Sequence, residues 1–581
     1  MAAPAKTFPG GSFLVSDGSP ADTFTPEDFT EDDRAIKAAA DDFARREIAP
    51  VAERMDAHDD ALLRSLMLQA GGLGFLGVDI SDAHGGLGLD LIASAQVFEA
   101  MGAANNGSFA VTLGAHTGIG TWPILYFGTD AQRAAYLPGI ASGQKIAAYA
   151  LTEAGSGSDA LGARTTAVLS EDGTHWIVNG GKVFITNAAI ADVFTVFVKI
   201  GGQNACLIVE KGTPGFAVGK EERKLGIKGS STCALSFDDA RVPAENLLGA
   251  IGKGHKIVLN TLNLGRFKLG VAAVGGLKAS VTSAVGYAAG RKQFGRPILD
   301  FDAIRQKIAE MTVKAWVGES MAYRAAGLLA AGLEGIAPGE EAAKAIEEHT
   351  VECSLVKVAL SEMLWDSVNH GVQVLGGYGY IEEGYPAARA LRDSRINLIF
   401  EGTNEINRML AVDALTKQVM KGKVDLFGAF GSLPPGSPPA AGSLRGSLAA
   451  AKHAVVHAFG EAVQRWMQAL KDEQQVLLAL ADLLIAAYGM DSALLRLEKL
   501  EAAGAADAPL AKDVVAAYFE EMRPLVRSRC EAVLCAVHAE PAARAAALAR
   551  SAGLRDDAPE DLIGLRKRIA EAAVAKGGYP L

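Results

Sequence analysis

The chain has 581 residues, 49% of them hydrophobic, which is enough to form several packed domains. Its formal net charge of −11 is spread along the chain; this excludes a global basic surface for nucleic acid but allows a local basic pocket for phosphates. The five cysteines show neither a CxxC pair nor a metal-ligand spacing, which suits a reducing compartment.

The first 26 residues are expected to form an N-terminal arm. They contain one lysine and no arginine, and they lack the basic face of a transit peptide and the apolar core of a signal peptide. The most apolar late segment, residues 476–490, is too short to span a bilayer and carries Asp482. We therefore expect a cytoplasmic protein without a transmembrane segment.

The composition changes several times after this arm and predicts a mainly helical fold with a central β domain. The arm is followed by a helical domain, the β domain, a second helical domain, a linker rich in proline and glycine, and an alanine-rich helical domain. The predicted boundaries of these five parts are 27–145, 146–250, 251–425, 426–446 and 447–581.

Two glycine pairs indicate β-hairpins in the central domain. Asn179-Gly180-Gly181 separates two β-rich runs, and Gly201-Gly202 interrupts another pair of runs. Thr186 is expected on a strand, where its hydroxyl could face a ligand.

Some motifs are better explained by structure than by chemistry. The segment Gly72–Gly77 formally matches a dinucleotide fingerprint, but it follows a helical pattern, so a helix end and a turn explain it better. His116 and His370 have no partners at metal-ligand spacing, which favours structural histidines, and we expect no metal site.

Three other segments could hold a flat or charged ligand. A loop with two glycines and several hydroxyls spans Tyr149–Ala160, and paired glycines occur in Gln373–Tyr380. Arg291, Lys292 and Arg296 surround an aromatic residue on an expected helix, as in an anion site. The alternatives are an ordinary surface loop and a solvated basic helix face.

Glu401 ends the apolar run in RINLIFEGTNEINRML. A carboxylate among apolar side chains has a raised pKa, which would make it a strong base. The simpler interpretation is a helix boundary, with Gly402 as the bend and Thr403 or Asn404 as the N-cap.

Six motifs along the chain decide between these two interpretations of Glu401. They are YALTEAGSGSD, KVFITN, RVPAENLLG, GRKQFG, QVLGGYGY and LRDSRINLIFEGTNEI. Similar motifs occur in the same order in the acyl-CoA dehydrogenases, and the chain resembles this family. TLGAHTGIG, ADVFTVFVK, LGIKGSST and LNLGRF resemble the very-long-chain branch, as does a helical domain after a linker. The resemblance implies a helical N-terminal domain, a β-barrel-like middle domain, a four-helix bundle and an appended C-terminal helical domain.

The resemblance also implies FAD bound between domains and across a subunit interface, in a homodimer or homotetramer. Glu401 matches the catalytic base. Positions matching FAD contacts are Tyr149, Leu151, Thr152, Gly157, Ser158, Phe184, Ile185, Thr186, Arg291, Phe294, Gln373, Gly376, Gly377, Thr403 and Glu405. Positions matching acyl-CoA contacts are Ser158, Asn263, Arg266 and Gly402.

The activity that the resemblance implies is α,β-dehydrogenation of long-chain acyl-CoA to trans-2-enoyl-CoA in β-oxidation. Glu401 would take the α-proton and FAD N5 the β-hydride, with an electron-transfer flavoprotein as the acceptor. Some branches place the base immediately before the arginine that Arg266 matches; that position is Gly265 here, so only Glu401 is left.

Departures and alternatives remain. Ala154 replaces a proline of the flavin loop, which would loosen it, and Phe184 replaces a tryptophan beside the flavin. An acyl-CoA oxidase that uses oxygen and a non-catalytic assembly protein of the same fold are the rival interpretations. The C-terminal segment is a mildly basic amphipathic helix, for which packing is favoured over contact with a membrane surface.

Overall fold

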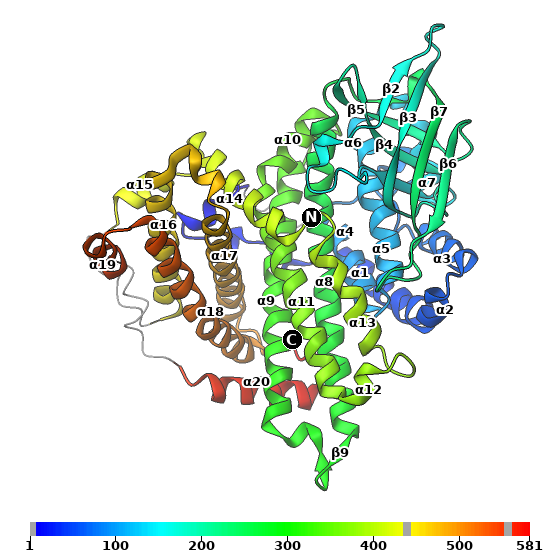
Figure 1. Cartoon of the computed structure of the whole chain (residues 1–581). Coiled ribbons are helices and arrows are strands. Elements are labelled where there is room, and N and C mark those ends of the chain that lie inside the picture. Colours follow the sequence, from blue (N-terminus) through cyan, green and yellow to red (C-terminus); the bar gives the residue numbers. More distant parts are fainter. Residues whose placement is uncertain (1–6, 434–442, 551–559) are drawn as a thin grey trace.

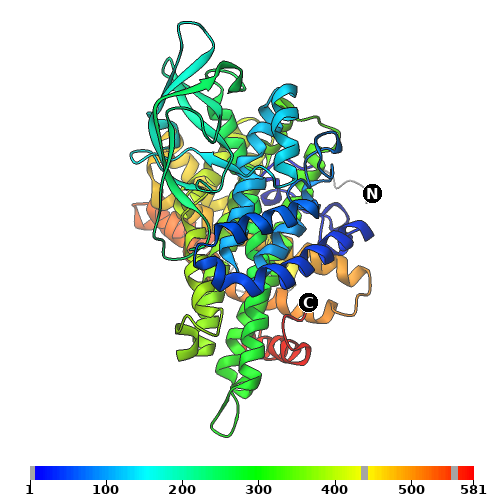
Figure 2. The ribbon, with the colours of Figure 1, turned by 90° about the vertical axis from the view of Figure 1, so that its right-hand side faces the viewer.

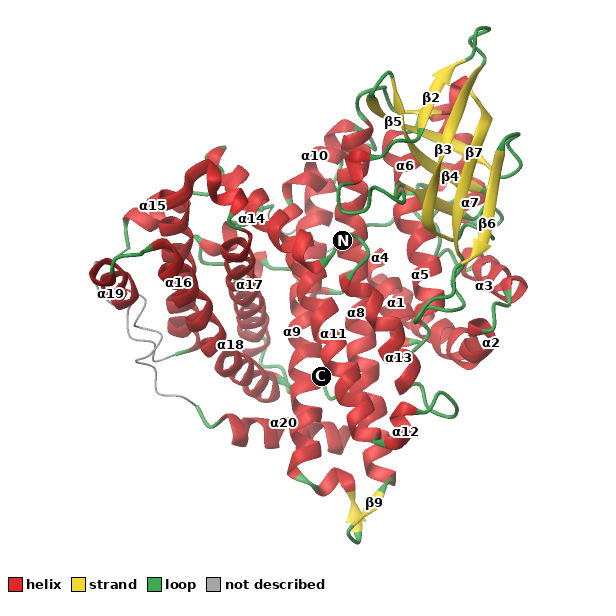
Figure 3. Cartoon of the chain, in the orientation of Figure 1, coloured by secondary structure: helices red, strands yellow, loops and turns green. Residues whose placement is uncertain are grey.

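The structure, a computed structural model, describes residues 7–433, 443–550 and 560–581. A bundle of long helices occupies the centre, with a β domain on one side and a separate group of helices on the other (Figure 1). Apart from the small β9–β10 hairpin, the strands lie in the β domain (Figure 3). The expected fold class, mainly helical with a central β domain and an appended helical domain, is confirmed.

The N-terminal helices lie against one side of the bundle, as the turned view shows (Figure 2). Local sequence sets their starts: Thr30 and Asp33 form a capping box at α1, and Thr129 and Gln132 form another at α7. Gly74, with φ +81°, follows the end of α3, which confirms a helix end and turn there. These helices are α1 Glu31–Phe43, α2 Ala52–Asp56, α3 Asp60–Gly72, α4 Leu91–Ala103, α5 Gly107–Gly114, α6 Trp122–Phe127 and α7 Asp130–Ala141.

The β domain is one eight-stranded sheet in which β6-β7-β3-β2-β4-β5-β8 are neighbours and β1 pairs with β4 in parallel. The expected hairpin at Gly201-Gly202 is confirmed, because β4 and β5 pair across it and both glycines have positive φ. The strands are β1 Ala147–Ala150, β2 Thr166–Leu169, β3 His175–Thr186, β4 Val193–Ile200, β5 Gln203–Glu210, β6 Phe216–Glu221, β7 Thr232–Pro243 and β8 Leu247–Leu248.

The hairpin expected at Asn179-Gly180-Gly181 was wrong, because β3 runs through it. The pairing of β3 with β7 shifts register between Val178 and Gly180, so the glycine lies at a bulge. Gly180 has φ +141°, and a Cβ there would lie 2.7 Å from the Thr165 hydroxyl. Gly180 thus allows the backbone of β3 to pass close to Thr165 within one long strand.

Three long helices and α14 build the central bundle. The segment 291–297, which we expected on a helix, forms a hairpin beyond the end of α8, because Gly295 at φ +80° permits a tight turn. The elements are α8 Gly254–Gly290, β9 Lys292–Gln293, β10 Arg296–Pro297, α9 Asp302–Leu333, α10 Glu340–Glu348, α11 Thr350–Leu375, α12 Gly377–Tyr380, α13 Ala387–Ser394 and α14 Asn404–Met420.

The appended domain packs against the bundle through α17 and α20. The predicted linker begins with a helix, α15, and its residues 434–442 lie outside the described residues. On α20, Leu565, Ile569 and Ala573 are buried, so its apolar face packs inside the protein. The helices are α15 Leu426–Gly431, α16 Leu444–Trp466, α17 Gln474–Ala502, α18 Ala508–Val537, α19 Pro541–Arg550 and α20 Leu562–Lys576.

Two helices of the described chain, α8 and α17, are long and apolar enough to cross a membrane. The apolar segment 476–490 lies inside α17, which extends beyond it at both ends. Half of the apolar window in α8 and 78% of that in α17 are buried against other parts of the fold.

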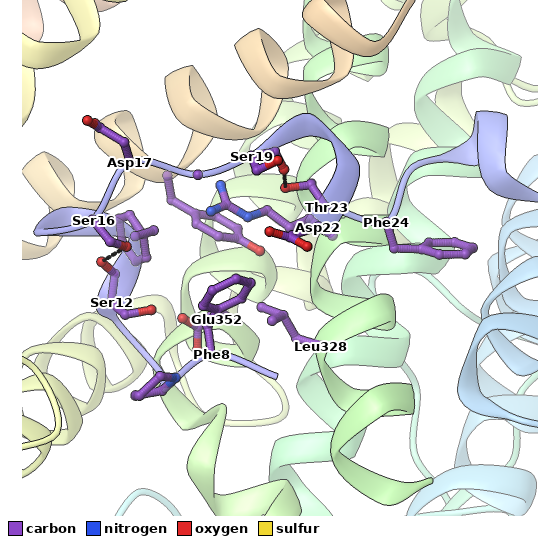
Figure 4. Close-up of a pocket in the computed structure, with 15 residues that line it drawn as sticks. Phe8, Ser12, Ser16, Asp17, Ser19, Asp22, Thr23, Phe24, Leu328 and Glu352 are labelled. Atoms are coloured by element: carbon purple, nitrogen blue, oxygen red, sulfur yellow. Dashed lines mark hydrogen bonds between the residues drawn. The ribbon is translucent and has the colours of Figure 1, made fainter. Parts of the chain in front are cut away.

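The arm lies between the bundle and the appended domain, over a small cavity (Figure 4). Phe8 and Thr23 of the arm face Leu328 and Glu352 of the bundle there. The Gly11 N–H donates to Glu352 Oε1 at 2.7 Å. With a volume near 60 Å³, the cavity has room for water molecules but not for an acyl chain.

Candidate active site

A tight turn between α13 and α14 carries Glu401. Glu401 has φ +59° and Gly402 has φ +84°, and the Thr403 hydroxyl caps α14 by accepting from the Ile406 N–H at 3.3 Å. Thr403 is thus the N-cap expected from the sequence. A left-handed backbone at a glutamate is strained by about 1–3 kcal/mol and persists only where the surroundings hold it.

Three buried side chains hold this turn by donating to its carbonyl oxygens. Arg266 Nε donates to Glu401 O at 3.2 Å. Asn407 Nδ2 and Lys357 Nζ both donate to Gly402 O, at 2.7 and 2.9 Å. The donors come from α8, α14 and α11, so the bundle fixes the turn from three sides.

The Glu401 carboxyl group lies against Gly265. A Cβ at residue 265 would be 2.7 Å from Glu401 Oε2, so only glycine leaves room for it. Oε2 is buried and has no hydrogen-bond partner among the described residues. Burial raises the pKa of Glu401 to about 7, although Arg266 and Lys357 oppose the shift. A carboxyl group with this pKa can act as a general base near neutral pH.

Sequence reasoning missed Lys357 and Asn407. Burial lowers the pKa of Lys357 to about 7, while Glu401 favours its charged form. A lysine inside the apolar run SLVKVALS was the available signal, since such a lysine needs a buried partner. Asn407 follows Thr403 by four residues, one helical turn into α14.

The predicted acyl-CoA contacts divide into two groups. Asn263 and Arg266 lie beside the turn: Arg266 Nη1 donates to Asn263 Oδ1 at 2.8 Å, and Asn263 Nδ2 donates to Thr350 Oγ1 at 2.9 Å. Gly402 is in the turn itself, whereas Ser158 is exposed on its loop. The structure therefore brings three of the four predicted acyl-CoA contact residues together around Glu401.

Most predicted flavin contacts from the β domain lie on β1, its following loop and β3. The Val183 N–H donates to Thr152 O at 2.9 Å, which joins the loop to β3. Tyr149 Oη is buried without a partner among the described residues. Burial raises the pKa of Tyr149, and the nearby Glu401 carboxylate raises it further. Leu151 and Ile185 are buried, Thr186 is half-buried, and Gly157 is exposed with open space around it.

The loop after β1 is anchored despite Ala154. Glu153 accepts from Lys182 Nζ at 2.7 Å and from the Thr165 N–H at 3.0 Å. The Glu153 and Ser156 backbones exchange two hydrogen bonds of 3.0 Å. These contacts tie the loop to β3 and to the segment before β2, and the looser loop expected from Ala154 stays a prediction.

Five predicted flavin contacts lie at the opposite end of the bundle. Arg291 follows Arg266 by 25 residues along α8, which corresponds to about 37 Å at 1.5 Å per residue. Phe294 is 93% exposed at the tip of the hairpin that β9 starts (Figure 1). Gln373, Gly376 and Gly377 are also exposed, at and beyond the end of α11. One chain does not bring this set to Glu401.

Three predicted site residues have a left-handed backbone. Phe184, Phe294 and Glu401 have φ of +58°, +52° and +59°, although none is a glycine. Phe184 is 64% exposed on β3, beside a register shift in the pairing with β7. An exposed aromatic ring next to a hydroxyl-bearing loop suits a flat, polar-edged cofactor. Glu405, in the first turn of α14, is exposed beside the half-buried Thr403.

The described residues contain no cluster of three or more His, Cys, Asp or Glu side chains suited to a metal ion. His116 is buried and accounted for: Nε2 lies 3.0 Å from Ile140 O, and Nδ1 accepts from the Ala147 N–H. His370 lies 3.1 Å from Glu310. Both histidines therefore have structural partners.

Family profiles match four parts of the chain. They are the N-terminal domain of acyl-CoA dehydrogenase at residues 30–144, the middle domain at 148–240, and two C-terminal domain profiles at 252–416 and 450–548. The last of these corresponds to the appended domain.

Curated relatives and solved structures agree with the profiles. A probable acyl-CoA dehydrogenase of Bacillus subtilis (strain 168) is 45% identical over 513 residues, 86% of each chain. The very long-chain specific acyl-CoA dehydrogenase of Rattus norvegicus is 39% identical over 60% of this chain and 52% of its own length. An acyl-CoA dehydrogenase complexed with FAD from Bacillus anthracis is 40% identical, with a TM-score of 0.95 over 99% of this chain and 100% of that one.

Proposed function

We propose that this chain, which belongs to the acyl-CoA dehydrogenase family, is an FAD-dependent oxidoreductase that removes two hydrogens from the α,β-bond of an acyl-CoA thioester. The observation that carries the proposal is Glu401 Oε2, which is buried beside Gly265 without a hydrogen-bond partner among the described residues; burial raises the pKa of this carboxyl group to about 7. The intact turn around this group argues against a non-catalytic assembly protein.

Glu401 would take the α-proton onto its carboxylate. Free thioester α-protons are very weakly acidic, so the thioester oxygen also needs hydrogen-bond donors while negative charge develops. Among the described residues the Glu401 N–H has no protein acceptor, so it is available to donate to that oxygen. Arg266, Asn407 and Lys357 fix the turn and so orient both groups of Glu401 at once.

FAD, when bound, supplies the acceptor for the hydride that leaves the β-carbon. Thr152, Phe184, Thr186 and Thr403 would hold it from one chain. Arg291 lies about 37 Å from Arg266 along α8, and Phe294 and Gln373 lie at the same end of the bundle, so these three would reach it only from a second copy. The proposed enzyme is therefore at least a homodimer.

The substrate and acceptor follow from the family resemblance. We propose a long-chain acyl-CoA as the substrate, β-oxidation as the process, and an electron-transfer flavoprotein as the acceptor. The similarity to the very-long-chain branch supports the chain length. The cytoplasmic location and the predicted domain boundaries stay predictions.

The test uses FAD-loaded protein, palmitoyl-CoA and no oxygen. The wild type is expected to lose the visible absorbance of oxidised flavin, and Glu401→Gln is expected to react about 10²–10⁴-fold more slowly. Asp413→Asn, which breaks only the exposed ion pair with Lys417, is the matched control and should react normally. Full bleaching in Glu401→Gln would refute the assignment, and peroxide production in air would indicate an oxidase.

A further inference from the structure

A network of charged and polar side chains joins the catalytic turn to the appended domain. Lys357, which donates to Gly402 O, also donates to Asn404 Oδ1 at 2.7 Å. Asn404 Nδ2 donates to Glu362 Oε1 at 3.0 Å, and Arg408 binds both Glu362 oxygens at 2.7 and 2.8 Å. Each link joins α11 to α14, the helix that begins at the turn.

The network continues into the appended domain through Asp482 on α17. Arg408 Nε donates to Asp482 Oδ1 at 2.8 Å, and Arg529 Nε on α18 donates to Asp482 Oδ2 at 2.8 Å. In Figure 1, α14 lies between the bundle and α17, and it packs against both α11 and α17. Asp482 is thus the point at which the appended domain contacts the network.

We propose that the appended domain positions the catalytic turn, and that Asp482 is the positioning residue through which it acts. The proposal rests on the proposed function only in taking Glu401 as the base. Asp482 touches neither Glu401 nor the turn; it acts by fixing Arg408.

The geometry of Arg408 makes this coupling strong. Each of its three guanidinium nitrogens donates to a carboxylate oxygen of Glu362 or Asp482, and its side chain is only 15% exposed, like the 16% of Asp482. Charge-assisted, two-pronged bonds of this kind fix orientation as well as position. Asn404 and Arg408 are four residues apart, so they lie on one face of the first turns of α14. A displacement of Arg408 therefore moves the helix end that carries the Gly402 carbonyl.

A second ion pair on the same helix provides the comparison. Asp491 on α17 lies 2.8 Å from Arg324 on α9 and 3.0 Å from Lys452 on α16. Lys452 also donates to Ser16 O in the arm at 3.1 Å. This pair also joins the appended domain to the bundle, but its contacts lead to the arm and not to the turn. A substitution at Asp491 therefore measures the effect of losing an interdomain ion pair that does not lead to the turn.

The experiment compares Asp482→Asn with Asp491→Asn in the full-length FAD-loaded protein. For Asp482→Asn we expect backbone amide hydrogen exchange in residues 401–410 to be about fivefold faster or more. We also expect kcat to fall about tenfold with KM changed less than about twofold. Asp491→Asn is expected to leave exchange at 401–410 and kcat unchanged, even if it lowers the melting temperature as much.

A double variant tests whether the effect passes through Lys357. The effects of Asp482→Asn and Lys357→Met on kcat should be non-additive, whereas those of Asp491→Asn and Lys357→Met should add. Unchanged exchange at 401–410 in Asp482→Asn, or the same exchange and kcat in both aspartate variants, would overturn the proposal. If the wild type turns over no acyl-CoA, the proposed function fails, and the exchange comparison still decides whether Asp482 positions the turn.

Discussion

The two ends of the central bundle differ in how complete they are. At one end, the backbone of Glu401 and Gly402 is held by buried donors from three helices. At the other, Phe294 is 93% and Tyr380 85% exposed. The first end is a turn held in place within one chain, and the second is a surface on which aromatic side chains are exposed.

This difference indicates that the proposed base and the proposed flavin-binding tip depend on different contacts. The turn depends on contacts within one chain, including those with the appended domain. The tip depends on what covers it, and a second copy of the chain is the partner that the two-ended distribution of flavin positions favours. Four predictions test the contrast, from the largest expected effect to the smallest.

Gly265→Ala should damage the turn end most. The new Cβ would lie 2.7 Å from Glu401 Oε2 and 3.1 Å from Ile119 Cγ2, so the carboxyl group must move. We expect kcat to fall about 10²-fold, measured with palmitoyl-CoA. Gly286→Ala on the same helix, where nothing lies within 4 Å of the new Cβ, is the control. Equal activity of the two variants would break the link between Gly265 and the base.

The activity should depend on pH through Glu401. The base acts as the carboxylate, and its pKa is raised to about 7, so kcat/KM should rise with pH and level off above 7. At pH 6 we expect about one tenth of the plateau value. A profile that is flat between pH 5 and 8 would show that no group with this pKa controls the reaction.

Phe294→Ala should weaken cofactor retention without harming the turn. Because the ring is almost fully exposed, its loss leaves no cavity within one chain, but it would remove a contact to FAD from the second copy. We expect FAD to bind about fivefold more weakly, measured by fluorescence titration of the flavin. The control is Ile563→Ala on α20, another exposed apolar side chain at 68%; a similar loss there would point to a non-specific effect.

Glu401→Gln should be slightly more stable than the wild type at high pH. The folded-state pKa of Glu401 is above its ordinary value of 4.5, so its contribution to stability is present below pH 4.5 and lost as pH rises through about 7. Glutamine avoids this loss. We expect a melting temperature a few degrees higher at pH 8.5, and a smaller difference at pH 5.5. A wild type that is the more stable protein at pH 8.5 would contradict the raised pKa.

Most elements could be predicted from the sequence, but several contacts could not; the role of Glu401 as base stays a prediction. Periodicity and turn residues indicated the helices, the Gly201-Gly202 hairpin and the Thr403 cap, because these depend on neighbours within a few residues. The hairpin predicted from the glycines at 180 and 181 was wrong, because Gly180 lies at a bulge between two strands that are distant in sequence. Lys357 was missed, because its partners at the turn are about 45 residues away in sequence.

The sequence by itself determined that Glu401 ends an apolar run, that a helical region follows a stretch rich in proline and glycine, and that residue 265 is a glycine, which carries no carboxylate. Only the tertiary structure decided that Gly265 makes room for the Glu401 carboxyl group, and that Arg266 lies inside α8 beside the turn while Arg291 follows the far end of the same helix. It also decided that Asp482 of the appended domain connects to the turn. The physical reason is that local patterns report a residue's own backbone, whereas burial, pKa and charge pairing depend on residues brought together from distant parts of the chain.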